Sequence, residues 1–310
     1  MLTVIVPCYN EEKSIPRFME AFQKEAERID EECTLLFVND GSKDDTLSVL
    51  KKTAEEYPFV HYISLSRNFG KEAAMYAGLC NAETEYTAIM DADLQDPPEL
   101  LHEMLDKVKN GGYDCAATRR KNRKGEPKLR SLFSDWFYSV FNRFSDIHID
   151  SGARDFRLMN RKMRDALVSM SEYNRFSKGL FSWVGFKTYW FSYENIERSA
   201  GKTKWNFWGL FRYALDGIVS FSDAPLTLAS WFGFIMTLVS FIALVFIVVR
   251  KLIFGDPVAG WASTICVIIF IGGIQLFSIG IIGTYISKIF TESKRRPVYI
   301  IDEGDREEYR

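Results

Sequence analysis

Three oxygen-bearing side chains lie close together in the chain, those of Asp91, Asp93 and Gln95. Carboxylate and amide oxygens suit Mg²⁺ or Mn²⁺, and such an ion can bridge the phosphates of a diphosphate substrate. A bare Asp-x-Asp pair is also typical of a solvated acidic turn, so the spacing alone leaves both interpretations open. The residues around the pair are needed to choose between them.

The neighbouring residues place this acidic segment at the end of a strand. Residues 86–90 are short, apolar and bounded by polar residues, which predicts a buried strand. The run Pro97-Pro98-Glu99 predicts the start of a helix, with Asp96 as its N-cap. The carboxylates are therefore expected at the carboxyl end of a strand, where ligands bind in open α/β sheets.

Similar polar loops follow the other apolar runs in residues 1 to about 118, where short apolar and amphipathic stretches alternate. This alternation predicts an α/β fold with a doubly wound, mostly parallel sheet. The expected strands are residues 3–6, 34–38, 61–65, 87–90 and 114–118, and the expected helices lie near 12–29, 44–57, 71–82 and 98–109. The polar loops should converge on one edge of the sheet, which favours a ligand site. Gly70-Lys71 fits either a phosphate-binding helix start or a tight turn with a surface lysine.

Composition excludes several classes of function. The net charge of −2 gives no reason to expect nucleic acid as a partner. The five cysteines form no Cys-x-x-Cys pair, which indicates free thiols rather than a zinc site or a disulfide framework. The three histidines are scattered, and we expect neither a histidine triad nor a cleavable signal peptide.

The middle of the chain has an interfacial character. A basic run at residues 119–124 precedes an aromatic-rich apolar stripe over residues 129–144, and a second aromatic amphipathic stretch covers 205–218. Each is compatible with a core helix, but the basic run favours helices lying on a membrane surface. Asp155, flanked by Arg154 and Arg157, could belong to an ion-pair network or be a site carboxylate.

The C-terminal part predicts a transmembrane hairpin. Residues 224–249 and 257–287 carry no charge, and each run exceeds the about 20 apolar residues that cross a bilayer. Basic residues precede the first span and follow the second, so the positive-inside rule predicts that both termini and the catalytic domain are cytoplasmic. Gly272, Gly273, Gly280 and Gly283 offer small-residue surfaces for packing in the hairpin or in a homo-oligomer.

These motifs, taken in order, resemble glycosyltransferase family 2. The segments that carry the resemblance are residues 4–12 (Val-Ile-Val-Pro-Cys-Tyr-Asn-Glu-Glu), 38–46 (Val-Asn-Asp-Gly-Ser-Lys-Asp-Asp-Thr), 66–71 (Ser-Arg-Asn-Phe-Gly-Lys) and 90–98 (Met-Asp-Ala-Asp-Leu-Gln-Asp-Pro-Pro). Within the family they resemble the polyprenyl-phosphate branch, similar to dolichol-phosphate-mannose synthases. The two-span tail resembles the bacterial undecaprenyl-phosphate glucosyltransferases. The resemblance implies a GT-A-like fold.

The resemblance also implies roles for particular residues. Pro7, Tyr9, Glu11, Asp40, Ser42 and Lys71 would bind the nucleotide-sugar donor, together with Asp91, Arg198 and Lys202. Asp91, Asp93 and Gln95 would bind Mg²⁺ or Mn²⁺. Arg119, Arg130 and Ser134 would hold the acceptor phosphate. Asp93 and Asp155 would be catalytic, and the role of Asp155 is the least specific of these expectations.

The expected organisation is a catalytic core at 1–125, an acceptor-side segment at 126–223, a hairpin at 224–289 (spans about 225–249 and 262–287) and a cytoplasmic tail at 290–310. The expected reaction is inverting transfer of a sugar, with UDP-glucose the leading donor, to undecaprenyl phosphate. N-acetylglucosamine or mannose transfer to the same lipid, and transfer to a non-lipid glycan, are alternatives. A non-catalytic membrane-anchoring module is the alternative from another class.

Overall fold

The structure is a computed structural model, and it describes residues 1–120, 139, 142–143, 145, 147, 149–150, 152–193, 219–254 and 261–309. The expected amphipathic helices at 129–144 and 205–218 lie almost entirely outside these residues.

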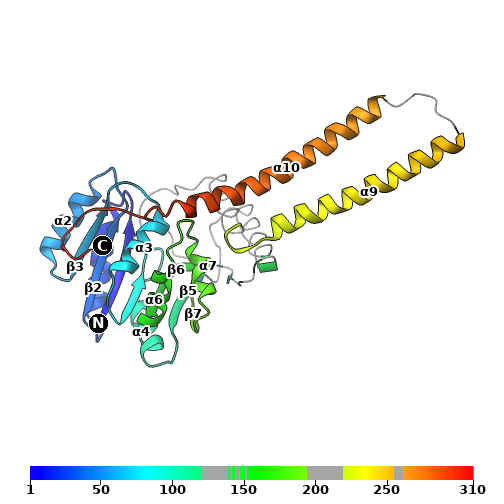
Figure 1. The fold of residues 1–310 in the computed structure, drawn as a ribbon. Helices are drawn as coiled ribbons and strands as arrows, with labels where there is room; N and C mark the ends of the chain where they lie inside the picture. The colour runs from blue at the N-terminus through cyan, green and yellow to red at the C-terminus, as the bar shows by residue number, and fades with distance from the viewer. Residues whose placement is uncertain are drawn as a thin grey trace.

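One mixed sheet organises the described chain, with strand order β7-β5-β6-β4-β1-β2-β3-β8 (Figure 1). The strands are β1 (Leu2–Cys8), β2 (Cys33–Asn39), β3 (Val60–Leu65), β4 (Tyr86–Ile89), β5 (Cys115–Arg120), β6 (Ala153–Asn160), β7 (Thr188–Tyr193) and β8 (Ile301–Gly304). β1 pairs in parallel with β2 and β4, and β2 pairs in parallel with β3. The carboxyl ends of these four strands therefore meet at one edge, as the sequence predicted.

Helices cover both faces of the sheet. They are α1 (Ser14–Ala26), α2 (Thr46–Glu56), α3 (Lys71–Asn81), α4 (Leu100–Lys109), α6 (Arg161–Ser169) and α7 (Ser177–Trp183). Successive strand residues point to opposite faces, so Val4 and Val6 pack in a core with α1 and α4, whereas Ile5 packs in a core with α3, α6 and α7. Burial on both faces explains why the central strands read as continuous apolar runs. The expected α/β class with a mostly parallel sheet is confirmed.

Three strands, β6, β7 and β8, lie outside the five that the sequence predicted. β7 is parallel to β5. The segment after residue 150 forms β6, which is antiparallel to both β4 and β5, and the C-terminal tail forms β8, antiparallel to β3. β6 was missed because its charged residues hide the strand pattern. The side chains of Asp155 and Arg157 lie on one face, and that of Arg154 lies on the other.

Two long helices leave the sheet side by side (Figure 1): α9 (Ala224–Phe254) and α10 (Trp261–Ser293). Two stretches within them, Ala224–Ala243 and Phe270–Ser293, are long and apolar enough to cross a membrane by length and composition. Their described large apolar side chains are mostly exposed, as in Phe241 and Phe277. An exposed apolar surface of this extent is typical of contact with lipid or with another protein.

Candidate functional site

The loops after β2 and β3 are joined through one carboxylate. Asp40 is 2% exposed and accepts hydrogen bonds from the backbone N–H groups of Phe69 (2.7 Å) and Gly70 (2.9 Å). Burial raises the pKa of Asp40, and these two N–H groups partly oppose that effect. Gly41 has φ +59°, and a Cβ at this position would collide with the backbone of Arg67. Only glycine allows both this conformation and the close approach of the two loops.

The loops after β1 and β2 are also joined. Ser42 Oγ accepts a hydrogen bond from the Asn10 N–H (2.9 Å), and Asn10 Oδ1 accepts one from the Lys43 N–H (2.8 Å). The Glu11 N–H donates to Thr46 Oγ1 at 2.8 Å. Asn10 takes a left-handed φ of 54°, which asparagine tolerates well. Pro7 lies near the end of β1 opposite Val38, and Tyr9 follows that strand, so the expected donor residues before position 72 share one edge.

Lys71 bridges two of the expected site carboxylates. Its Nζ lies 2.6 Å from Asp91 Oδ1 and 2.6 Å from Asp155 Oδ2. Burial acts to lower the pKa of Lys71, but the attraction of Asp155 and then Asp91 outweighs it and raises that pKa. Burial acts to raise the pKa of Asp155, but Lys71 and then Lys178 hold it below its ordinary value. At neutral pH Asp155 is therefore an ionised carboxylate beside the Lys71 ammonium.

Asp155 thus belongs to an ion-pair network, but its partner is Lys71 on α3 and not the arginines beside it in sequence. The strand places Arg154 on the opposite face, where its Nε donates to Asp96 Oδ1 at 3.0 Å.

Asp96 is not the helix N-cap that the sequence predicted. Helix α4 begins at Leu100 with Glu99 at the N-cap position, and Glu99 makes no side-chain capping bond. Asp96 is 1% exposed and is bound by Arg154 and by the hydroxyl of Tyr193. Burial raises the pKa of Tyr193, and the charge of Asp96 raises it further. A buried carboxylate requires such partners. Asp96 is bound by Arg154 and Tyr193, and it therefore does not cap helix α4.

The residues after the Asp-x-Asp pair are also held by arginines. Asp93 Oδ1 accepts a hydrogen bond from the Gln95 N–H at 3.2 Å. Gln95 Oε1 accepts from Arg120 Nη2 (2.8 Å) and from Arg154 Nη2 (3.4 Å). The sequence reasoning did not single out Arg120 and Arg154 as site residues. Arg120 and Arg154 are adjacent in sequence to Arg119 and Asp155, which the sequence did indicate as site residues. This adjacency was the signal that could have identified them.

The expected acceptor residues are only partly described. Arg119 is 43% exposed at the end of β5, with Nε 3.0 Å from Ser192 Oγ and Nη1 3.5 Å from Asp150 Oδ1. Arg130, Ser134, Arg198 and Lys202 lie outside the described residues, and their roles stay predictions.

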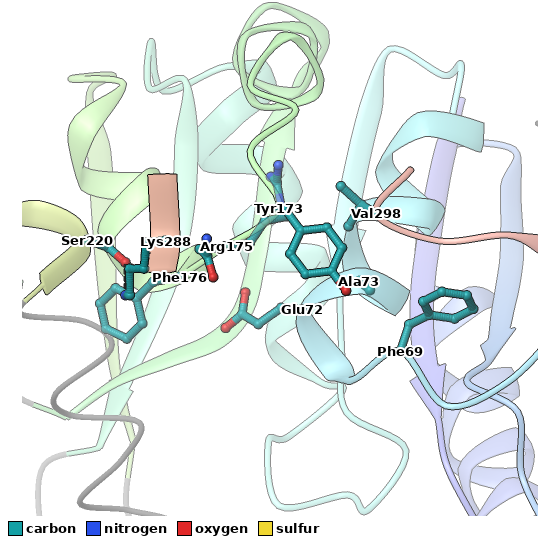
Figure 2. A pocket seen from close by; sticks show the side chains of 10 residues that line it. Phe69, Glu72, Ala73, Tyr173, Arg175, Phe176, Ser220, Lys288 and Val298 are labelled. Atoms are coloured by element: carbon teal, nitrogen blue, oxygen red, sulfur yellow. Dashed lines mark hydrogen bonds between the residues drawn. The ribbon is translucent and has the colours of Figure 1, made fainter. Parts of the chain in front are cut away.

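A cavity of about 240 Å³ lies between the N-terminal end of α3 and the C-terminal part of α10. Figure 2 shows the Glu72 carboxylate in it, with Phe176, Ser220 and Lys288 on one side and the Tyr173 ring on the other. Glu72 accepts hydrogen bonds from the N–H (2.9 Å) and hydroxyl of Ser177. Burial and then repulsion by Asp155 raise the pKa of Glu72. Helix α10 therefore lies beside the residue that follows Lys71 in sequence.

The described residues meet the needs of a divalent cation only in part. Asp91 and Asp93 supply the carboxylates that Mg²⁺ or Mn²⁺ prefers. However, no group of three or more acidic, histidine or cysteine residues in the described ranges is arranged to hold a metal. Lys71 binds Asp91, and both acceptor directions of the Gln95 oxygen face guanidinium groups. The carboxylates of Asp91 and Asp93 suit the ion by their chemistry, but an ion on Asp91 would compete with Lys71, and an ion on Gln95 would displace an arginine.

The chain belongs to glycosyl transferase family 2, whose profile matches residues 3–168. This makes the protein a glycosyltransferase, and the observed sheet agrees with the mostly parallel α/β fold that the sequence predicts.

Similar full-length proteins extend the likeness beyond that domain. The chain is 43% identical over 305 residues to a Bacillus subtilis (strain 168) protein provisionally named glycosyltransferase CsbB, covering 98% of this chain and 92% of that one. It is 39% identical over 300 residues to the bactoprenol glucosyl transferase of Shigella phage SfV, covering 97% of each. The aligned length includes the two apolar helices.

Among solved structures, the chain is similar to glucosyl-3-phosphoglycerate synthase from Mycobacterium tuberculosis, with 14% identity and a TM-score of 0.48 over 71% of this chain and 77% of that one.

Proposed function

We propose that the protein transfers glucose from UDP-glucose to a polyprenyl phosphate, undecaprenyl phosphate, at the cytoplasmic face of a membrane. The observation that carries the proposal is the match to a bactoprenol glucosyl transferase over 97% of this chain, apolar helices included. N-acetylglucosamine and mannose are the alternative sugars. Supporting observations are the polar loops gathered at one sheet edge and the exposed apolar surfaces of α9 and α10.

The chemistry of the acceptor fits the side chains at this edge. A lipid phosphate is ionised near neutral pH, so its oxygen can attack the anomeric carbon without a dedicated general base. The main obstacle is the approach of two anions, an acceptor phosphate and a donor diphosphate. We propose that Arg119, with Arg130 and Ser134, holds the acceptor phosphate, because charge-assisted hydrogen bonds from arginine suit phosphate oxygens.

The donor side would use the loops after β1, β2 and β4. The Asp40 carboxylate joins the loop after β2 to the loop after β3, which supports a role in shaping the nucleotide pocket formed with Pro7, Tyr9 and Glu11. Asp91 and Asp93 would hold Mg²⁺ or Mn²⁺. When bound, the ion would neutralise the charge that develops on the leaving diphosphate. Lys71 would keep Asp155 ionised and oriented toward the sugar, and an in-line displacement would invert the anomeric centre.

The direct test uses purified protein in detergent with radiolabelled UDP-glucose, with and without undecaprenyl phosphate. We expect label to enter the organic phase only when the lipid, Mg²⁺ or Mn²⁺ and the native protein are all present. Asp93→Asn is the matched variant, because it keeps the side-chain shape and removes the charge. Label that stays in the aqueous phase under all conditions would refute the lipid acceptor, and binding without any turnover would favour an anchoring module.

A kinetic variant tests the acceptor side separately. We expect Arg130→Ala to raise the acceptor KM far more than the donor KM, because a phosphate contact is lost while the donor loops are untouched. A panel of nucleotide sugars, with mass spectrometry of the lipid product, would identify the sugar.

A further inference from the structure

A second cavity lies on the same face of the sheet as Asp155. It has a volume of about 190 Å³ and lies between β6, β7 and α7. Its polar lining includes Arg157, Lys178, Ser182 and Asp150. Arg157 follows Asp155 by two positions in β6, so both side chains leave the same face of the strand.

Arg157 is a buried cation with incomplete partners. Its side chain belongs to a residue that is 3% exposed, and its guanidinium carbon lies 3.5 Å from the centre of the Phe181 ring. Nη2 donates to the Arg154 carbonyl at 3.1 Å, while the buried Nε has no hydrogen-bond partner among the described residues. Burying a charge is unfavourable unless an opposite charge or several hydrogen bonds compensate it.

The charge of the lining favours an anion. Arg157 and Lys178 are both cationic, and the one carboxylate among the described lining residues, Asp150, faces Arg119 at 3.5 Å. Ser182 and Thr188 add hydroxyl groups to the lining. Each donates to a backbone carbonyl, Ser182 to that of Lys178 (3.4 Å) and Thr188 to that of Phe186 (3.2 Å), and would have to rotate to donate to a phosphate oxygen. Arg119, at the end of β5, thus pairs with the carboxylate at the margin of the cavity.

The surroundings of the cavity include Asp155 and the segment that leads into helix α9. Burial raises the pKa of Asp155, and Lys71 lowers it. Lys178 is close enough to Asp155 to lower that pKa further, although its effect is smaller than those two. On α7, the next residue, Gly179, packs against the ring of Phe221, three residues before α9 begins. An anionic head group whose lipid chain runs along α9 could therefore reach the cavity.

We infer that this cavity binds the phosphate monoester of the acceptor, with Arg157, Lys178 and Ser182 as ligands beside Arg119. The inference rests on the proposed lipid-phosphate acceptor and adds phosphate ligands to it. The chemistry recognised is a tetrahedral dianion, so the test has to separate an isoprenyl phosphate from free phosphate.

The experiment measures binding and not turnover. Farnesyl phosphate and inorganic phosphate are titrated by calorimetry into the full-length protein in detergent, and UDP-glucose is titrated in parallel. The variants are Lys178→Gln and Ser182→Ala, with Arg157→Gln added after thermal unfolding shows that it folds. Lys162→Gln is the matched control, because Lys162 is an exposed lysine over Phe186 that does not line the cavity.

We expect Lys178→Gln and Arg157→Gln each to weaken farnesyl phosphate binding on the order of tenfold to a hundredfold, as for a lost charge-assisted hydrogen bond. UDP-glucose binding and the Lys162→Gln control should change by less than about twofold. Unchanged farnesyl phosphate binding in these variants would overturn the inference, and Arg157 would then only clamp Phe181. Weakened UDP-glucose binding, or equal affinity for inorganic and farnesyl phosphate, would also overturn it. A native protein that binds farnesyl phosphate at this site but transfers no sugar would instead refute only the proposed function.

Discussion

Replacing Lys71 by Met should destabilise the protein in a manner that depends on pH. The change keeps most of the side-chain volume and removes the ammonium that lies 2.6 Å from both Asp91 and Asp155. The two carboxylates then face each other across the site with their shared counter-charge gone. We therefore expect a loss of stability at neutral pH, together with a loss of any transfer activity.

The magnitude follows from the exposure of the three side chains. Breaking a fully buried pair costs about 3–5 kcal/mol, whereas exposed pairs contribute about 0.2–1 kcal/mol. Lys71 is 42% exposed, and Asp91 and Asp155 are 20% and 19% exposed, so solvent screens the pairs in part. We expect a loss of about 1–3 kcal/mol at pH 7, or roughly 2–10 °C in Tm.

The pH dependence distinguishes charge from packing. The folded-state pKa of Asp155 is lowered, so its contribution is present above the unfolded value of about 3.9 and is lost as pH falls through the folded pKa. The pKa of Lys71 is raised, so its contribution is constant below about pH 10. The stability difference between native protein and Lys71→Met should therefore be full at pH 7 and shrink by about pH 3.

Thermal unfolding in detergent at pH 7 and pH 3 measures this difference. Lys24→Met is the matched control, because Lys24 forms a pair with Glu20 in which both side chains are about three-quarters exposed, at 74% and 75%. The control should match the native protein at both pH values. An equal destabilisation by Lys71→Met at pH 7 and pH 3 would refute the electrostatic reasoning.

Three further substitutions test other contacts. Gly41→Ala should lower stability by about 1–3 kcal/mol in denaturant titrations, because it combines a positive φ with a collision against the Arg67 backbone; a neutral result would mean that the two loops can separate freely. Arg154→Met should cost about 2–4 kcal/mol because it leaves buried Asp96 without its ion pair, and Arg161→Met, at an exposed arginine, is the control that should stay near native. Glu292→Ala should leave Tm nearly unchanged but speed hydrogen exchange at Tyr173 and Asn174, whose N–H groups donate to the Glu292 carboxylate at 2.9 and 3.0 Å; unchanged exchange would show that Glu292 does not hold this loop.

The central part of the fold could be predicted from the sequence because its signals are local. Short apolar runs separated by amphipathic stretches specify β1 to β5 and α1 to α4, to within a few residues at each end. Parallel pairing then places their following loops at one edge, so Asp40, Lys71 and Asp91 could be brought together by reasoning alone. The long uncharged stretches of α9 and α10 were equally visible, since each exceeds the about 20 apolar residues that can cross a bilayer.

Long-range contacts depended on the tertiary structure. Asp155 was correctly considered for an ion pair, but its partner Lys71 is 84 residues away in the chain, and a period-two strand sends Arg154 to the opposite face. The expected cap at Asp96 was wrong for the same reason: β6 and β7 bring the Arg154 guanidinium and the Tyr193 hydroxyl to a buried carboxylate that the local sequence assigned to a helix end. Local patterns report propensity and burial, whereas the partner of a buried charge is decided by which strands lie side by side.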